Sequence, residues 1–187
     1  VAEVSDVYDP DNLLGVTFEP GDTVSGTYTV DTEVPDLFPD QYVGRYEQPL
    51  EAGLGFDLTA NGLAFRSVSE QSPVDVRVEN WPDSDFHHVQ SHGNEPLPGG
   101  MPIDSIALGF GDPEGTAFDS DALTPGVPLA DGYDDRTLSI VGYAPDGSGL
   151  YQVMSRVVAI ELEDGSVFEV SPPAATFVGD QSVSLAL

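Results

Sequence analysis

Residues 54–68 read LGFDLTANGLAFRSV, and this stretch decides the fold class. Apolar residues alternate with small or polar ones up to Thr59, and a second apolar run extends from Leu63 to Val68. A period of two places apolar side chains on one face of a β-strand. Asn61-Gly62 between two such runs is a strong β-hairpin signal, because both residues tolerate positive φ. We therefore predict two antiparallel strands joined by a tight turn.

The same pattern of short alternating runs continues through the rest of the chain. No window of helical length has apolar residues at a spacing of 3.6 without an interrupting Gly or Pro, and the chain has 20 Gly and 16 Pro. Further strands are predicted at Val1–Val7, Leu13–Phe18, Thr23–Asp31, Val74–Val78, Ile106–Phe110, Thr137–Tyr143, Leu150–Leu162, Ser166–Val170, Ala175–Val178 and Ser182–Leu187. So many strands exceed one flat sheet. We predict a single all-β domain over residues 1–187, an antiparallel two-sheet β-sandwich that is jelly-roll-like.

Three stretches are predicted to be long acidic loops. They are Pro35–Pro49, Asn80–Met101 and Gly111–Tyr133. Loops of this length often carry function in compact domains.

The charge of the chain limits its partners. There are 33 acidic residues against five basic ones, all arginines, for a net charge of −28. This balance excludes nucleic-acid binding, which needs basic side chains facing phosphate, and an anionic membrane would repel the chain. Self-repulsion destabilises the compact state unless salt or divalent ions screen it. The acidity is explained either by adaptation to a salty medium or by a calcium-loaded surface.

Cysteine is absent, which excludes disulfides, thiol catalysis and thiolate metal sites. No apolar run approaches the roughly 20 residues of a membrane-spanning helix. The first residue is Val1, which predicts a processed chain whose leader has been removed. Together these features favour a secreted protein that is extracellular or attached to the cell surface.

The block Pro20–Phe65 contains Ser25-Gly26-Thr27-Tyr28, Pro35-Asp36, Gly44-Arg45-Tyr46 and Asn61-Gly62. In this order the block resembles the N-terminal half of small exported bacterial proteins of the PEP-CTERM sorting group. The resemblance covers about a quarter of the chain. It implies export and a role in an extracellular matrix or at the surface, and it implies no enzymatic activity. No Pro-Glu-Pro anchor, apolar span or basic tail follows Leu187, so membrane retention would require a sorting tail that has been cleaved.

Within that block, Arg45 is one of the few cations and has Asp36, Asp40 and Glu47 as acidic neighbours. A guanidinium binds a carboxylate through two hydrogen bonds and stacks on aromatic rings. We expect Arg45 to clamp the surrounding loop.

The three histidines of the chain, His87, His88 and His92, fall within six residues. Neutral imidazoles near carboxylates suit Zn²⁺, Cu²⁺ or Ni²⁺. If this segment is a strand, His88 and His92 share one face and His87 points away, which allows at most a two-histidine site. The alternative is a polar hairpin with ordinary solvated histidines.

Calcium is the better metal prediction, because acidic residues one position apart recur in turns and hard oxygen ligands suit Ca²⁺. The candidate ligands are Asp9, Asp11, Asp119, Asp121, Asp131, Asp134 and Asp135. No EF-hand loop is present. Aspartate also favours turns because its side chain accepts bonds from nearby backbone amides, which explains any single pair without a metal.

Catalytic motifs are missing, so we predict that the protein is not an enzyme. There is no Gly-x-Ser-x-Gly motif, and the absence of lysine excludes a phosphate-binding P-loop. The leading hypothesis is an extracellular structural protein, a subunit of a surface layer, biofilm matrix or filament. It would self-associate partly by adding Val1–Val7 and Ser182–Leu187 to a neighbour's sheet.

Two alternatives remain open. The first is a carbohydrate-binding module that holds a polysaccharide by stacking sugars on Trp81, Tyr42 and Tyr46, although these aromatics could instead cover the edge of the core. The second is a metal-dependent enzyme at the segment that contains His87, His88 and His92.

Overall fold

The computed structural model describes residues 1–38, 40–123, 133–162, 167–169 and 183–186. Its strands are β1 (Ala2–Tyr8), β2 (Thr23–Val30), β3 (Val43–Glu47), β4 (Gly55–Ala60), β5 (Leu63–Arg66), β6 (Val74–Trp81), β7 (Ser84–Ser91), β8 (Ser105–Asp112), β9 (Asp135–Tyr143), β10 (Leu150–Val157), β11 (Ala159–Leu162), β12 (Val167–Glu169) and β13 (Val183–Ala186). The paired strands are antiparallel, and no helix occurs in the described residues. These residues accordingly contain no helix that could cross a membrane. The predicted all-β antiparallel fold is confirmed.

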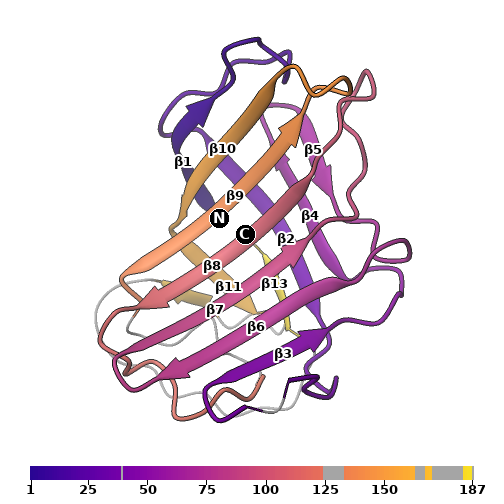
Figure 1. Ribbon diagram of the computed structural model, residues 1–187. Coiled ribbons are helices and arrows are strands. Elements are labelled where there is room, and N and C mark those ends of the chain that lie inside the picture. The colour runs from indigo at the N-terminus through magenta and orange to yellow at the C-terminus, as the bar shows by residue number, and fades with distance from the viewer. Residues whose placement is uncertain (39, 124–132, 163–166, 170–182, 187) are drawn as a thin grey trace.

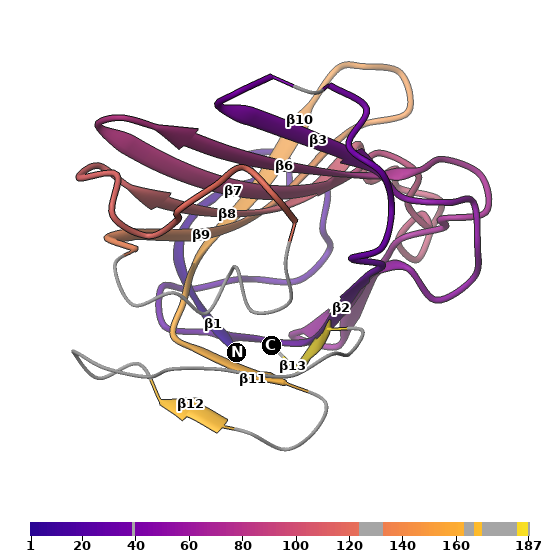
Figure 2. The same cartoon turned by 90° about the horizontal axis from the view of Figure 1, so that it is seen from below.

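The strands form one curled sheet. Neighbours follow the order β12-β11-β13-β2-β1-β10-β9-β8-β7-β6-β3, and β4 and β5 extend from β2. Strands β10 to β3 cross the front of the molecule with β2 and β4 behind them (Figure 1), and the view from below shows the sheet bending round an interior (Figure 2). Pairing continues from β1 to β2, where Ala2 pairs with Val24. The front strands (β3 and β6 to β10) and the back strands (β2, β4, β5 and β13) are here called the two limbs of the sheet. Because β1 pairs with both β10 and β2, the two limbs belong to one sheet, and the predicted two-sheet, jelly-roll-like sandwich is not confirmed.

Gly26 lies where β2 changes its strand partners. Val24 of β2 pairs with β1, whereas Thr27 pairs with both β13 and β4. The φ angle of Gly26 is 152°, and a Cβ at this position would overlap the backbone carbonyl of Asp57 on β4. Glycine is therefore required for β4 to approach β2 this closely.

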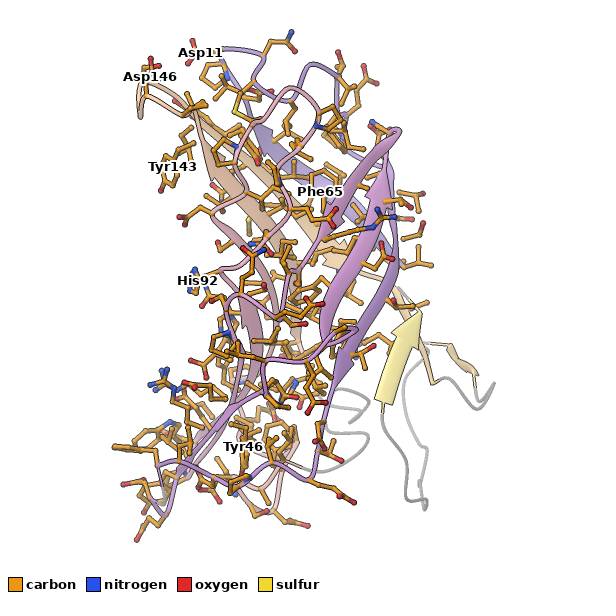
Figure 3. The ribbon with its side chains drawn as sticks, turned by 90° about the vertical axis from the view of Figure 1, so that its right-hand side faces the viewer. Asp11, Tyr46, Phe65, His92, Tyr143 and Asp146 are labelled. Atoms are coloured by element: carbon orange, nitrogen blue, oxygen red, sulfur yellow. The ribbon has the colours of Figure 1, made fainter. Side chains whose placement is uncertain are left out.

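The core fills the space between the two limbs. Tyr28 and Phe56 contribute from one limb, with ring centroids 6.0 Å apart, and Phe65 lies between the limbs in Figure 3. Leu108, Leu138 and several other fully buried side chains face them from β8, β9 and β10. Burial of such side chains stabilises the fold by roughly 1.5–3 kcal/mol each.

The predicted hairpin is confirmed as β4 and β5. Ala60 pairs with Leu63, and the two residues between them have φ angles of 49° (Asn61) and 82° (Gly62). Positive φ at both central positions matches the twist of the flanking strands. The Asn61 side-chain amide also donates to the carbonyl oxygen of Thr17 at 2.9 Å, which ties the turn to the neighbouring loop.

Three local predictions were wrong. Residues 13–18 form no strand, because Asp9 accepts hydrogen bonds from the amides of Leu13 and Leu14 and holds a turn there. Two segments predicted as loops contain the strands β3 and β7. Both were missed because their inward positions include polar or glycine residues, which hide the alternation.

The terminal strands lie inside the sheet rather than at its edges. Strand β1 pairs with β10 on one side and with β2 on the other, and β13 pairs with β2 and β11. The ammonium group of Val1 also donates to the carbonyl oxygen of Ala159 at 2.7 Å. The residues Ala2 and Glu3 of β1 and Leu185 and Ala186 of β13 thus have strand partners on both sides, and self-association through the terminal strands stays a prediction. The predicted strand at 175–178 lies outside the described residues.

Candidate functional site

The described surface has a groove on the outer face of β3, β6 and β7, here called the outer groove. Outward-facing side chains line it because alternate residues of each strand point away from the core. The lining residues are Phe38, Val43, Arg45, Asp75, Arg77, His88 and Gln90. Its volume of about 320 Å³ lies at the lower end of the range of small-molecule sites, roughly 300–1,000 Å³.

A row of three basic side chains crosses the outer groove. Arg45 of β3 pairs in register with Arg77 of β6, which pairs with His88 of β7. Two like charges directly opposite each other on a sheet repel. Carboxylates therefore have to accompany this row if it is to be stable.

Two acidic residues of β6 supply that compensation. Asp75 accepts hydrogen bonds from Nε of Arg45 at 3.0 Å and from Nη2 at 2.7 Å, a two-point contact. Glu79 holds Nε of Arg77 at 2.9 Å through Oε1. The guanidinium groups are thus fixed in orientation and offset in charge. The Arg45 guanidinium therefore binds Asp75 of β6, 30 positions further along the chain, and not an acidic residue of the surrounding loop as predicted.

His88 contributes an uncharged ring at neutral pH. Burial lowers the pKa of its imidazole below the ordinary value of 6.5, an effect that the nearby carboxylate of Asp75 partly opposes. A neutral imidazole offers one hydrogen-bond donor and one acceptor. The ring stacks on Phe86 with centroids 5.7 Å apart and planes at 21°.

An exposed aromatic ring borders the outer groove on the β3 side. Phe38 is 59% exposed and belongs to the loop that precedes β3. Asp36 positions this loop, because its Oδ1 accepts from the amides of both Phe38 and Arg45 at 2.9 Å. The amide of Leu37 donates to the carbonyl oxygen of Arg45 at 2.8 Å. The loop is therefore held along the edge of β3 with Phe38 at the groove.

A second aromatic pair lies at the end of the β6–β7 hairpin. Tyr42 and Trp81 stack with centroids 5.0 Å apart and planes at 23°. Nε1 of Trp81 donates to Oε2 of Glu79 at 2.7 Å, and 38% of Trp81 stays exposed. Two of the three predicted sugar-stacking residues are therefore neighbours on the surface.

Tyr46, the third predicted stacking residue, lies in the interior. It is 6% exposed, and its hydroxyl donates to the carbonyl oxygen of Asp121 and accepts from the amide of Leu123. These bonds at 2.9 and 3.0 Å attach the 113–123 segment to the sheet. Tyr46 is therefore a structural residue, and its ring is not available to a sugar.

The three histidines do not converge. His87 points inward and is 1% exposed, His88 lines the outer groove, and His92 is exposed after the end of β7. The part of the chain that the structure describes has no group of three or more His, Asp or Glu side chains placed to hold a metal ion. The described geometry thus gives no support to an enzymatic metal centre at this segment.

Two polar side chains that point inward from β7, those of Asp85 and His87, are incompletely paired. Both ring nitrogens of His87 and Oδ1 of Asp85 lack hydrogen-bond partners among the described residues. Oδ2 of Asp85 accepts from the amide of Phe118 at 2.8 Å, and the ring of Phe110 lies 6.1 Å from that of His87. Burial lowers the pKa of His87 to about 3, so the ring is neutral in the folded protein at ordinary pH.

The candidate calcium ligands are distributed over separate loops. Asp9 is used by a turn, Asp121 accepts from Tyr46 through its backbone, and Asp134 and Asp135 are exposed. Asp11 lies at one end of the molecule near Asp146, with Tyr46 at the opposite end (Figure 3). Asp119 is exposed, and Asp131 lies outside the described residues. Calcium binding stays a prediction.

Sequence reasoning missed most of the outer groove. Alternation in the predicted strand Val74–Val78 places Asp75 and Arg77 on the face opposite its valines, but it does not bring Arg45 and His88 beside them. That step requires the register of β3, β6 and β7, which no local pattern reveals. Comparison of the chain with protein families, curated proteins and solved structures gave no match.

Proposed function

We propose that this chain is a non-enzymatic, extracellular carbohydrate-binding domain that holds a neutral glycan in the outer groove. The observation that carries the proposal is the combination of orientation-fixed polar side chains with an exposed aromatic ring in one shallow groove. Export and a surface location follow the resemblance of residues 20–65 to exported proteins.

The chemistry of the lining suits sugar hydroxyls, which donate and accept hydrogen bonds at the same time. Asp75 accepts, Arg77 donates, and Gln90 does both. Because Arg45 and Arg77 are already held by carboxylates, little side-chain freedom is lost on binding. The face of Phe38 can pack against the apolar C–H face of a sugar ring.

The charge balance favours a neutral glycan over an acidic one. Asp75 in the groove offsets the charge of Arg45, Glu79 beside the groove offsets that of Arg77, and His88 is uncharged at neutral pH. The chain as a whole carries −28 and repels polyanions. Uncharged hydroxyl groups meet no such barrier.

Under this proposal the protein would join an extracellular matrix by binding polysaccharide, without self-assembly. A protein that binds polysaccharide becomes part of an extracellular matrix without adding strands to a neighbour. The structural-subunit hypothesis, a filament or surface layer assembled partly through the terminal strands, stays a second candidate.

The proposal is tested by titrating soluble neutral polysaccharides, and acidic ones for comparison, into the protein by calorimetry. Arg77→Ala should weaken binding at least about tenfold, because a hydrogen bond to a charged group contributes roughly 1.5–3 kcal/mol and each 1.4 kcal/mol is a factor of about ten. Tyr143→Ala is the matched control, since Tyr143 is a 46% exposed aromatic on β9, outside the groove. No binding to any neutral glycan, or unchanged binding by Arg77→Ala, would contradict the proposal.

A further inference from the structure

We infer that the bound glycan runs parallel to β6 and β7, from the polar end of the outer groove to Trp81 at the tip of the hairpin. The inference rests on the carbohydrate-binding function proposed above and extends it from a single groove to an oligosaccharide site. It assigns Trp81 as the residue that recognises chain length.

The outward positions of the two strands form a ladder of pairs. Along the hairpin the pairs in register are Asp75 with Gln90, Arg77 with His88, Glu79 with Phe86, and Trp81 with Ser84. The first two pairs supply polar lining of the groove, and the last two supply aromatic rings. A ligand that follows the strands therefore meets hydrogen-bonding groups first and ring faces afterwards.

Glycines on the neighbouring strand keep the aromatic half of this path flat. A Cβ at Gly109 or Gly111 of β8 would lie 3.5 or 3.8 Å from the ring of Phe86. Without side chains at these positions, Phe86 spreads over the backbone of β8 and still remains 38% exposed. The surface beyond the groove is thus a low aromatic platform rather than a barrier.

The path across the strands is restricted on the β3 side. There the loop bonded to Arg45 places Phe38 at the groove. The direction along the strands leads instead to the stacked pair of Tyr42 and Trp81. Glycan chains are long, so the open direction is the one they can occupy.

The length of the path separates short ligands from long ones. Trp81 lies six positions after Asp75, and at about 3.3 Å per residue in a strand this spans roughly 20 Å. A disaccharide in the groove does not reach Trp81, whereas a longer oligosaccharide does. Trp81 is already held by Tyr42 and Glu79, so stacking on it requires little further ordering.

The test uses a length series of one neutral oligosaccharide that binds the wild-type protein. Affinity should rise with length and then level off. Trp81→Ala should weaken binding of the long members about tenfold and leave the disaccharide unchanged, while Tyr143→Ala changes neither. Equal loss for short and long ligands, or no loss for either, would overturn the inference.

A second readout needs no substitution, because Trp81 is the single tryptophan of the chain. Its fluorescence should shift when long oligosaccharides bind and stay constant when the disaccharide binds. If the disaccharide binds in an Arg77-dependent way but length has no effect, only the chain direction is wrong. If no neutral glycan binds at all, the proposed function itself fails.

Discussion

Residues of the same type serve different purposes here, and their positions in the strands decide which. Tyr42 precedes β3 and stacks on the surface, whereas Tyr46 lies within β3 on its inward face. Both were predicted to stack on a sugar. Composition and loop character alone could not separate them, because the strand β3 that determines their faces was itself not recognised.

The two tyrosines give a matched pair of variants. Tyr46→Phe removes the partner of the buried amide of Leu123 and of the Asp121 carbonyl, and should lower the free energy of unfolding by about 1–3 kcal/mol. Tyr42→Phe should change it by less than about 0.5 kcal/mol. Urea unfolding measures both. Glycan affinity should be unchanged in Tyr46→Phe, and a loss of binding at constant stability would restore it as a ligand contact.

His87 predicts a distinct pH dependence. Its pKa is about 3 in the folded chain against an ordinary 6.5, so below pH 6.5 the unfolded state gains a proton that the folded state does not. The contribution of neutral His87 to the free energy of unfolding is therefore fully present above pH 6.5. As the pH falls below 6.5, this contribution decreases by up to about 1.4 kcal/mol per pH unit until the pKa of the folded state is reached.

The comparison is between wild type and His87→Leu in urea unfolding at pH 7 and pH 5. Between pH 7 and pH 5 the free energy of unfolding should fall by up to about 2 kcal/mol more in wild type than in the variant. The titration of the carboxylates is common to both proteins and cancels in the comparison. His92→Gln, at an exposed position, should follow wild type. The same pH slope in His87→Leu and wild type would argue against a buried neutral ring.

Among the elements, the β4–β5 hairpin was predictable from its sequence and β7 was not. The hairpin depends on local signals, namely alternation and Asn61-Gly62. Strand β7 places Asp85 and His87 on its inward face, where apolar residues are expected. The strand forms despite this polarity because its backbone pairs with both β6 and β8, a long-range property that a local pattern does not report.

Glycine positions in β2 and the hairpin turn predict a graded response to alanine. At Gly62 a Cβ would meet no neighbour within 4 Å. Gly62→Ala should therefore lower the free energy of unfolding only by the strain of alanine at positive φ, roughly 1–2 kcal/mol. Gly26→Ala adds an overlap with the backbone of β4 and should be clearly more destabilising. Chemical unfolding ranks the two, and an equal or reversed order would mean that β4 does not approach Gly26 as closely as described.

For the whole molecule, the sequence was sufficient to predict a helix-free, all-β fold. It was not sufficient to predict how the strands are distributed between sheets. Whether many strands form two sheets or one curled sheet depends on where a single strand changes partners. Here β2 does so at Gly26, a residue that reads as an ordinary interruption in the sequence.

The charge of −28 predicts salt-dependent stability. Raising NaCl from 0.1 M to 1 M shortens the screening length from about 10 Å to about 3 Å and should raise the melting temperature by several degrees. Calorimetric melts with CaCl₂ and with chelator, at matched ionic strength, separate screening from site binding. A rise specific to calcium would support the predicted calcium sites, and a melting temperature independent of salt would contradict self-repulsion.

The place of β1 in the sheet has a consequence for biogenesis. Its register partner β10 ends some 150 residues downstream, at Val157. Only its first residues pair with the nearby strand β2, so the rest of β1 has no strand partner until β10 has been synthesised. Pairings this distant in sequence make folding slow. We expect the pairing of β1 with β10 to be a late step of folding, so that the N-terminal strand takes its final place only after β10 is available.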